Sequence, residues 1–128
     1  MIKVGINGLG RIGRLAFRSI IDRKNIEVVA INDLLTIEHL AYLLKYDSVH
    51  GKFKGTIEVK NDALIVNGKS IRITSNQNPD YIQWNLVDVD FVIESSGHFT
   101  DKKQAGLHLK GGAKRVVFQP PQKMLLCL

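Results

Sequence analysis

The chain has 128 residues, which fits one domain and leaves little room for a second. Hydrophobic residues make up 45% of the sequence and charged residues 23%, as in an ordinary soluble globular protein with a buried core. The net charge of +6 is compatible with nucleic acid or phosphorylated small molecules as ligands, but the basic residues are scattered, so most are expected on a solvated surface.

Strand-like and helical segments alternate in the first part of the chain. Residues 2–6 are apolar and β-branched and lead into Asn-Gly, which predicts a strand followed by a turn. Apolar residues recur at helical spacing over residues 11–22 and predict a helix with one inward face. Residues 28–31 form a continuous apolar run, as in a parallel strand covered on both faces. A second helix, capped by Thr36, is predicted over residues 36–45.

The middle of the chain predicts an antiparallel excursion from the main sheet. Residues 56–59, 63–66 and 70–74 are short β-type runs. They are separated by Asn61-Asp62 and Asn67-Gly68, and Asn-Gly is a strong hairpin signal because both residues tolerate positive φ. We expect the last of these strands to rejoin the main sheet.

The alternation resumes after the predicted hairpin. A short helix is predicted over residues 79–85, a buried strand over 89–94, a helix over 100–109 and a strand over 115–118, with a turn at Gly111-Gly112. The whole pattern predicts an α/β fold, a Rossmann-type doubly wound parallel sheet with right-handed crossovers and a β-hairpin insert.

A Gly-x-Gly-x-x-Gly motif joins the first predicted strand to the first predicted helix. The motif alone is weak evidence, but this position is where a dinucleotide-binding loop needs it. Gly8 makes the tight turn, Gly10 leaves room for a pyrophosphate, and Gly13 lets the helix pack close to the sheet. The helix N-terminus, through the backbone N–H groups of Arg11 and Ile12, offers donors and a positive dipole end to phosphates.

An acidic residue ends the second predicted strand. Asp33 can accept hydrogen bonds from the adenosine ribose hydroxyls, and its charge repels a 2′-phosphate, which favours NAD over NADP. The alternative interpretation is an Asx turn after a strand. The glycine motif nearby favours the cofactor interpretation.

A polar turn follows the predicted strand over residues 89–94. Ser96 and Gly97 are expected at the carboxyl ends of the strands, on the pyrophosphate-to-nicotinamide side of the ligand. Phe99 is expected to pack against the nicotinamide end. The alternative is a plain strand-to-helix turn in which Thr100 caps the next helix.

Other kinds of site find little support in the sequence. No GxxxxGK phosphate loop and no RNP-like signature is present. His39, His50, His98 and His108 lack metal-ligand spacing, so we expect surface or supporting groups and no metal site. A single cysteine, Cys127, excludes an internal disulfide and is expected to be an inert thiol. No membrane span and no signal-peptide layout is seen, so a cytoplasmic location is predicted.

Four segments, in matching order and spacing, resemble the glyceraldehyde-3-phosphate dehydrogenase family. They are KVGINGLGRIGR at residues 3–14, IND at 31–33, YDSVHG at 46–51 and ESSG at 94–97. The resemblance covers residues 1–118 and implies an NAD-binding domain from a cytoplasmic glycolytic oxidoreductase that is usually a homotetramer.

The family's strand order, 3-2-1-4-5-6, also implies that the sixth strand of the sheet is lacking here. Val116, Val117 and Phe118 would then form an exposed apolar edge, and we expect possible self-association through it.

The chain departs from the family pattern at one expected cofactor contact. The family usually has Glu-Arg-Asp-Pro where this chain has Asn76-Gln77-Asn78-Pro79. Gln77 retains a backbone carbonyl but lacks the arginine charge on the adenine side. We therefore expect weaker binding of the adenine side, without its loss.

The last ten positions, residues 119–128, form a tail unlike the family. The family continues roughly Ser-Ala-Pro-Ser-Lys-Asp-Ala-Pro-Met-Phe-Val, and reading codons for these residues one nucleotide late can give every residue from Gln119 to Leu128. We therefore interpret residues 1–118 as the NAD-binding domain and the tail as a frameshift product. On this hypothesis Cys127 is not the family's nucleophile, which lies in a part expected to be missing. Gene sequencing tests it, because the DNA downstream must encode the rest of a dehydrogenase in another frame.

The sequence thus predicts an NAD-binding domain of a glyceraldehyde-3-phosphate dehydrogenase-like oxidoreductase that is catalytically inactive by itself. Two alternatives stay open: an interaction module that binds RNA or a protein through the basic dinucleotide cleft, and a working subunit whose missing half comes from another chain. The residues predicted to bind NAD are Asn7, Gly8, Gly10, Arg11, Ile12, Gly13, Asn32, Asp33, Gln77, Ser96, Gly97 and Phe99.

Overall fold

An eight-stranded sheet organises the molecule, in the order β10-β9-β8-β1-β2-β7-β6-β5. The structure is a computed structural model that describes residues 1–47, 51–97, 102–118 and 126–127. The strands are β1 (Ile2–Asn7), β2 (Ile26–Asn32), β5 (Ile57–Lys60), β6 (Ala63–Val66), β7 (Lys69–Thr74), β8 (Phe91–Glu94), β9 (Arg115–Phe118) and β10 (Leu126–Cys127).

The centre of the sheet is parallel. β1 pairs in parallel with β2 on one side and with β8 on the other, and β7 and β9 extend the parallel part outward. The predicted Rossmann-type arrangement is therefore confirmed. Parallel strands end at the same edge of the sheet, so the loops after β1, β2, β7 and β8 gather there, where such sheets bind ligands.

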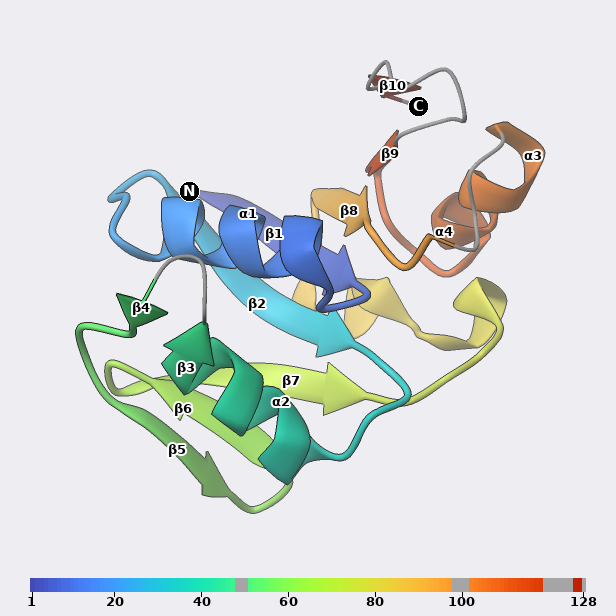
Figure 1. Cartoon of the computed structure of the whole chain (residues 1–128). Helices are drawn as coiled ribbons and strands as arrows, with labels where there is room; N and C mark the ends of the chain where they lie inside the picture. The colour runs from blue at the N-terminus through green and yellow to red at the C-terminus, as the bar shows by residue number, and fades with distance from the viewer. Residues whose placement is uncertain (48–50, 98–101, 119–125, 128) are drawn as a thin grey trace.

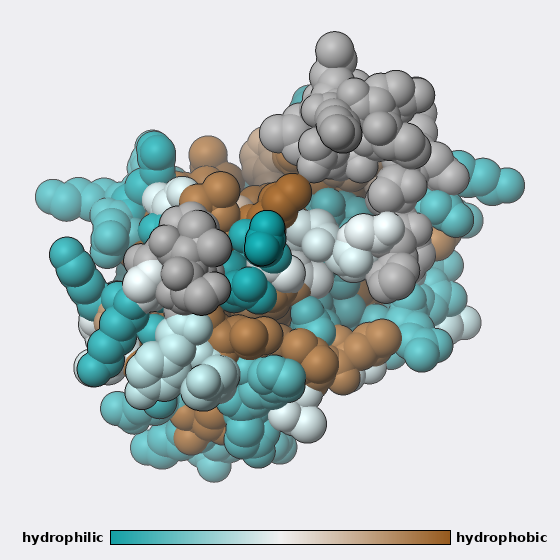
Figure 2. Space-filling view, viewed as in Figure 1, coloured by the Kyte–Doolittle hydropathy of each residue, from teal (hydrophilic) through white to brown (hydrophobic). Residues whose placement is uncertain are grey.

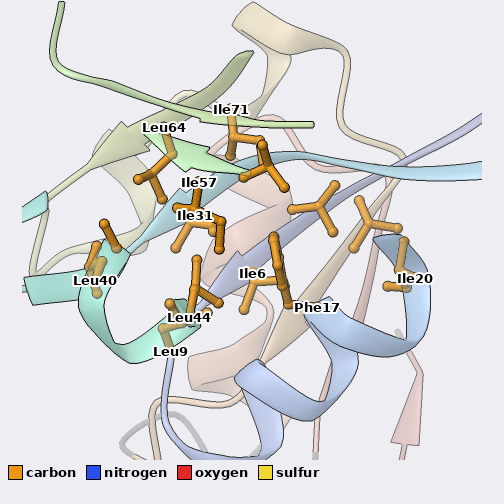
Figure 3. Close-up of a cluster of buried hydrophobic side chains, with 14 residues drawn as sticks. Ile6, Leu9, Phe17, Ile20, Ile31, Leu40, Leu44, Ile57, Leu64 and Ile71 are labelled. Carbon is orange, nitrogen blue, oxygen red and sulfur yellow. The ribbon is translucent and has the colours of Figure 1, made fainter. Parts of the chain in front are cut away.

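Two helices cover one face of the sheet, α1 (Arg11–Ile21) and α2 (Ile37–Lys45) (Figure 1). Thr36 caps α2, since its hydroxyl oxygen accepts a hydrogen bond from the backbone N–H of His39 at 3.2 Å. Figure 3 shows the core beneath the helices, where Phe17 of α1 and Leu44 of α2 meet Ile6 and Ile31 of the central strands. All four side chains are fully buried.

A second core is built around Trp84. This residue begins the 3-10 turn η2 (Trp84–Val87), which follows another, η1 (Pro79–Tyr81). Trp84 is fully buried and packs with Ile82, Val89 and Val92. The segment predicted as a short helix over residues 79–85 therefore forms 3-10 turns that place Trp84 in this core.

The predicted antiparallel excursion is confirmed. β5, β6 and β7 form an antiparallel meander, and β7 rejoins the main sheet in parallel with β2. Positive φ at Asn61, Asp62, Asn67 and Gly68 makes the two turns.

Two details of the fold differ from prediction. The helix expected over residues 100–109 is two short helices, α3 (Lys102–Ala105) and α4 (Leu107–Lys110), with Gly106 at the break. Glycine is a poor helix former, which accounts for the interruption. A short antiparallel pair, β3 (Tyr46–Asp47) and β4 (Gly51–Lys52), was not predicted.

The predicted exposed edge at residues 116–118 is wrong. β10 pairs antiparallel with β9, so that Leu126 lies opposite Phe118 and Cys127 opposite Val117. Val116 and Phe118 are buried together with Ala105 of α3. The sheet therefore continues beyond β9, and the backbone of β9 does not form its edge.

None of the described helices is long and apolar enough to cross a membrane. Figure 2 shows apolar surface beside polar surface over the middle of the face seen in Figure 1. The exposed apolar side chains of the molecule include Ile12, Leu15, Leu34 and Leu35.

Candidate functional site

The loop between β1 and α1 packs tightly against the loop after β8. The Ser95 N–H donates to the carbonyl oxygen of Asn7 at 2.9 Å, and the Ser95 hydroxyl donates to that of Gly8 at 2.7 Å. Gly8 has φ +92°, and a Cβ there would lie 2.5 Å from Cα of Ser96. Only glycine therefore fits at this turn.

A side chain would have different consequences at Gly13 and at Gly10. A Cβ on Gly13 would lie 2.2 Å from the carbonyl oxygen of Gly8, so α1 could not approach the loop so closely. A Cβ on Gly10 would meet only the carbonyl oxygen of Ser95, at 4.0 Å, and Gly10 has an extended backbone. The protein itself therefore does not require glycine at position 10. A Cβ at position 10 would occupy open space next to the loop.

The first turn of α1 faces the same loop. The helix begins at Arg11 and has no acidic residue in its first turn, and its first backbone hydrogen bond runs from the Arg14 N–H to the Gly10 carbonyl oxygen at 2.9 Å. The positive end of the helix dipole therefore meets the loop without an acidic side chain from that turn.

Asp33 is held by two backbone donors. Its Oδ2 accepts from the Leu9 N–H at 2.7 Å and its Oδ1 from the Leu35 N–H at 3.0 Å. The second contact is the Asx turn considered for this position. The first ties the end of β2 to the glycine loop. Each carboxylate oxygen has further acceptor capacity, so these bonds leave room for ligand hydroxyls.

A row of buried polar side chains crosses the carboxyl ends of the parallel strands. Asn32 Nδ2 donates to Asn7 Oδ1 at 2.7 Å, and Asn7 Nδ2 donates to Glu94 Oε1 at 2.6 Å. The Thr74 hydroxyl and the Asn76 N–H donate to Asn32 Oδ1 at 2.7 and 2.9 Å. These bonds join the ends of β7, β2, β1 and β8.

Glu94 is the buried acid of this row. Burial alone would raise the pKa of its carboxyl group, but hydrogen bonds from His108, Ser96 and Asn7 outweigh burial and hold the pKa below its ordinary value. Glu94 is therefore a charged acceptor at neutral pH, although only 6% of it is exposed.

A cavity of about 630 Å³ lies where these loops meet, within the usual size range of small-molecule and cofactor sites. Its lining combines glycine backbone, amides, one carboxylate and a leucine cluster. The lining residues are Asn7, Gly8, Leu9, Gly10, Arg14, Asn32, Asp33, Leu34, Leu35, Leu43, Asn76, Gln77, Ser95 and Ser96.

The cavity brings together many of the predicted cofactor residues. Those that line it are Asn7, Gly8, Gly10, Asn32, Asp33, Gln77 and Ser96. Those placed beside it, outside the lining, are Arg11, Ile12, Gly13 and Gly97. Phe99 and Thr100 lie outside the described residues. Which of these residues contact a cofactor stays a prediction.

Sequence reasoning missed part of the lining and the support behind it. Leu34 and Leu35 directly follow Asp33 and are exposed in the structure, and the signal in the sequence is a pair of apolar residues beside a polar strand end. His108 is fully buried and hydrogen-bonded to Glu94, whereas His39 is exposed. No local pattern distinguishes the two histidines. The described residues contain no cluster that could hold a metal ion.

Comparison with known proteins identifies relatives that align with most of the chain. Residues 2–102 match the family model described as glyceraldehyde 3-phosphate dehydrogenase, NAD binding domain. The chain is 57% identical over 122 residues to the glyceraldehyde-3-phosphate dehydrogenase of Buchnera aphidicola and 54% identical over 122 residues to form A of Escherichia coli. It is 52% identical over 123 residues to the cytosolic enzyme of Trypanosoma brucei brucei. These alignments cover 95–96% of this chain and 37% of each relative.

Proposed function

The chain belongs to the glyceraldehyde-3-phosphate dehydrogenase family through its NAD-binding domain, and we propose that the cavity at the carboxyl edge of its sheet is the NAD site. In this proposal the backbone of Gly8 and Gly10 and the start of α1 face the pyrophosphate. Asp33 accepts hydrogen bonds from the adenosine ribose, and Ser96 lies toward the nicotinamide end.

One observation carries the proposal, the open space at Gly10. The chain keeps a glycine where the backbone would accept any residue and where a Cβ would meet no close protein atom. Gly10 is also one of the residues that line the cavity. A pyrophosphate that approaches the backbone would need this open space.

The leucines of the cavity suit the other end of the cofactor. Leu34, Leu35 and Leu43 give the lining beside Asp33 an apolar surface, as the flat face of an adenine ring requires. Gln77 also lines this cavity. Its neutral side chain is the reason for the weaker adenine-side binding expected from the sequence.

NAD, when bound, supplies the acceptor for a hydride. The residues of this chain bind and orient the dinucleotide and, through the charge of Asp33, disfavour a 2′-phosphate. We propose that the 128 residues by themselves bind NAD without catalysing aldehyde oxidation, because they correspond to 37% of the length of the relatives. The glycolytic reaction and the tetramer of the family belong to the whole protein. The cytosol is the expected compartment, as in the name of the trypanosome relative.

The test is calorimetric titration of the purified chain with NAD and with NADP. Saturable binding that prefers NAD supports the proposal, even at a dissociation constant of about 1 mM, which corresponds to about −4 kcal/mol. Replacing Gly10→Ala should weaken NAD binding at least about tenfold. Its melting temperature should stay close to that of the parent chain, since the added methyl group meets no close protein atom. No binding by the parent chain, or unchanged binding by the variant, contradicts the proposal.

The interaction-module alternative predicts a different titration. Arg14 lines the cavity and Arg11 is exposed beside it, so a single-stranded RNA phosphate backbone could contact this mouth. That alternative requires RNA binding that weakens steeply with salt and that NAD displaces. If NAD does not bind and RNA does, this second function replaces the first.

A further inference from the structure

His108 lies outside the cavity lining but is part of the polar row behind it. It belongs to α4, and its side chain is fully buried. The indole N–H of Trp84 donates to His108 Nδ1 at 3.0 Å, and the two rings lie 5.8 Å apart between centroids. An indole N–H can only donate, so Nδ1 carries a lone pair. The ring proton therefore sits on Nε2.

The protonated nitrogen faces Glu94. Nε2 lies 2.7 Å from Glu94 Oε1, which also accepts from Asn7 Nδ2 at 2.6 Å. The other carboxylate oxygen, Oε2, accepts from both the backbone N–H and the hydroxyl of Ser96, at 2.8 and 2.7 Å. One side of the carboxylate is thus held by His108 and Asn7, and the other side holds Ser96.

Glu94 connects two residues of the cavity wall. Asn7 and Ser96 line the cavity, whereas Glu94 and His108 do not. The orientation of the wall therefore depends on a carboxylate that His108 and Asn7 fix from behind. A buried polar arrangement of this kind gains little stability over well-packed apolar side chains, so its benefit is better sought in the geometry it imposes.

We propose that His108 is a positioning residue for the NAD site, which orients Glu94 through its Nε2–H and thereby fixes Ser96 and Asn7 at the cavity wall. This rests on the proposed function, that the cavity binds NAD. The proposed positioning role belongs to Nε2, which contacts Glu94. Nδ1 accepts the hydrogen bond from Trp84, which orients the ring and fixes its tautomer.

Two substitutions separate the nitrogens. In His108→Asn the amide oxygen is bonded to Cγ, as Nδ1 is in histidine, so it can accept the hydrogen bond from Trp84. The asparagine side chain is too short to reach Glu94. In His108→Gln the amide nitrogen reaches about as far as Nε2, so it can donate to Glu94, and the acceptor for Trp84 is lost. Each variant loses one buried hydrogen bond and retains the other.

His108→Asn should bind NAD about tenfold more weakly, because Glu94 would then no longer hold Ser96 and Asn7 in a fixed orientation at the cavity wall. His108→Gln should restore most of that affinity. Trp84 is the only tryptophan, so tryptophan fluorescence reports the hydrogen bond between Trp84 and His108. The emission should change in His108→Gln but not in His108→Asn. The same pair of changes at exposed His39 is the control and should alter neither affinity nor emission.

Equal affinities of the two His108 variants would overturn the inference and show a structural role only. If neither variant folds, the parent chain decides the matter by nitrogen-15 NMR of the His108 ring. The Nε2–H resonance should shift when NAD is added, although the ring does not line the cavity, and an unshifted resonance contradicts the proposal. Failure of the parent chain to bind NAD would instead overturn the proposed function.

Discussion

At the scale of single residues, Glu94 shows how a buried charge is accommodated. Its carboxylate accepts hydrogen bonds from His108, Asn7 and Ser96, and all of these hydrogen bonds are lost when the chain unfolds. Charged acceptors are costly to bury alone, but several donors offset that cost. The lowered pKa of Glu94 therefore means that its ionised carboxylate stabilises the folded state.

Acid should destabilise the fold partly through Glu94. Because the folded-state pKa lies below the ordinary value of 4.5, the native state binds fewer protons than the unfolded chain in this range. The stabilisation is fully present above about pH 4.5 and is lost as the pH falls through the folded-state pKa. Glu94→Gln should cost about 1–3 kcal/mol at pH 7, because an amide nitrogen then faces donors. Its unfolding free energy should depend less on pH below 4.5 when measured by urea denaturation.

Asp90 provides the comparison for this measurement. A hydrogen bond from the Lys3 N–H and the ammonium group of Lys114 lower the pKa of its carboxyl group, so some acid sensitivity should remain in Glu94→Gln. An acid profile identical to that of the parent chain would mean that Glu94 is not charged in the native state.

At the scale of elements, the approach of α1 to the strand ends depends on Gly13. A Cβ there would overlap the Gly8 carbonyl oxygen and lie 2.9 Å from Ser95 Oγ, and backbone atoms cannot yield as a flexible side chain can. Gly13→Ala should therefore destabilise the chain by about 1–3 kcal/mol and weaken NAD binding together with stability. Thermal unfolding checks the first effect and calorimetry the second.

The contrast with Gly10→Ala makes this prediction specific. Both changes add one methyl group in the same loop, but the methyl at position 10 would meet no close protein atom, whereas the methyl at position 13 would overlap the Gly8 carbonyl oxygen. Equal melting temperatures for the two variants would show that α1 can move away from the loop at little cost.

Most elements were predictable because their signals are local. The alternation of apolar runs and helical spacing marked β1, α1, β2 and α2, and Asn67-Gly68 marked the hairpin by its need for positive φ. The two 3-10 turns were predicted as one short helix, but each buries a single apolar residue, Pro79 in the first and Trp84 in the second. β10 has no signal of its own, since its pairing depends on β9 already lying beside it.

The site was predictable to the same degree and for the same reason. The glycine motif and Asp33 are recognisable by their place after strands, and the structure brings them to one cavity. The bond between Trp84 and His108 joins residues 24 positions apart, and that between Glu94 and Asn7 joins residues 87 apart. Such contacts follow from topology, so only the fold could identify them.

At the scale of the whole molecule, β10 decides how the sheet ends. It pairs with β9, whose Val116 and Phe118 face the core, so loss of β10 would leave an apolar strand with unpaired backbone groups. A chain that stops before Leu126 should therefore associate more strongly than the full chain in sedimentation velocity at matched concentrations. Adding Val117→Lys to the shortened chain should reverse this, because a charge on the half-buried central residue of β9 opposes edge pairing. Identical sedimentation of the full and shortened chains would mean that pairing with β10 does not protect the edge, and that the core contacts of β9 alone keep it from association.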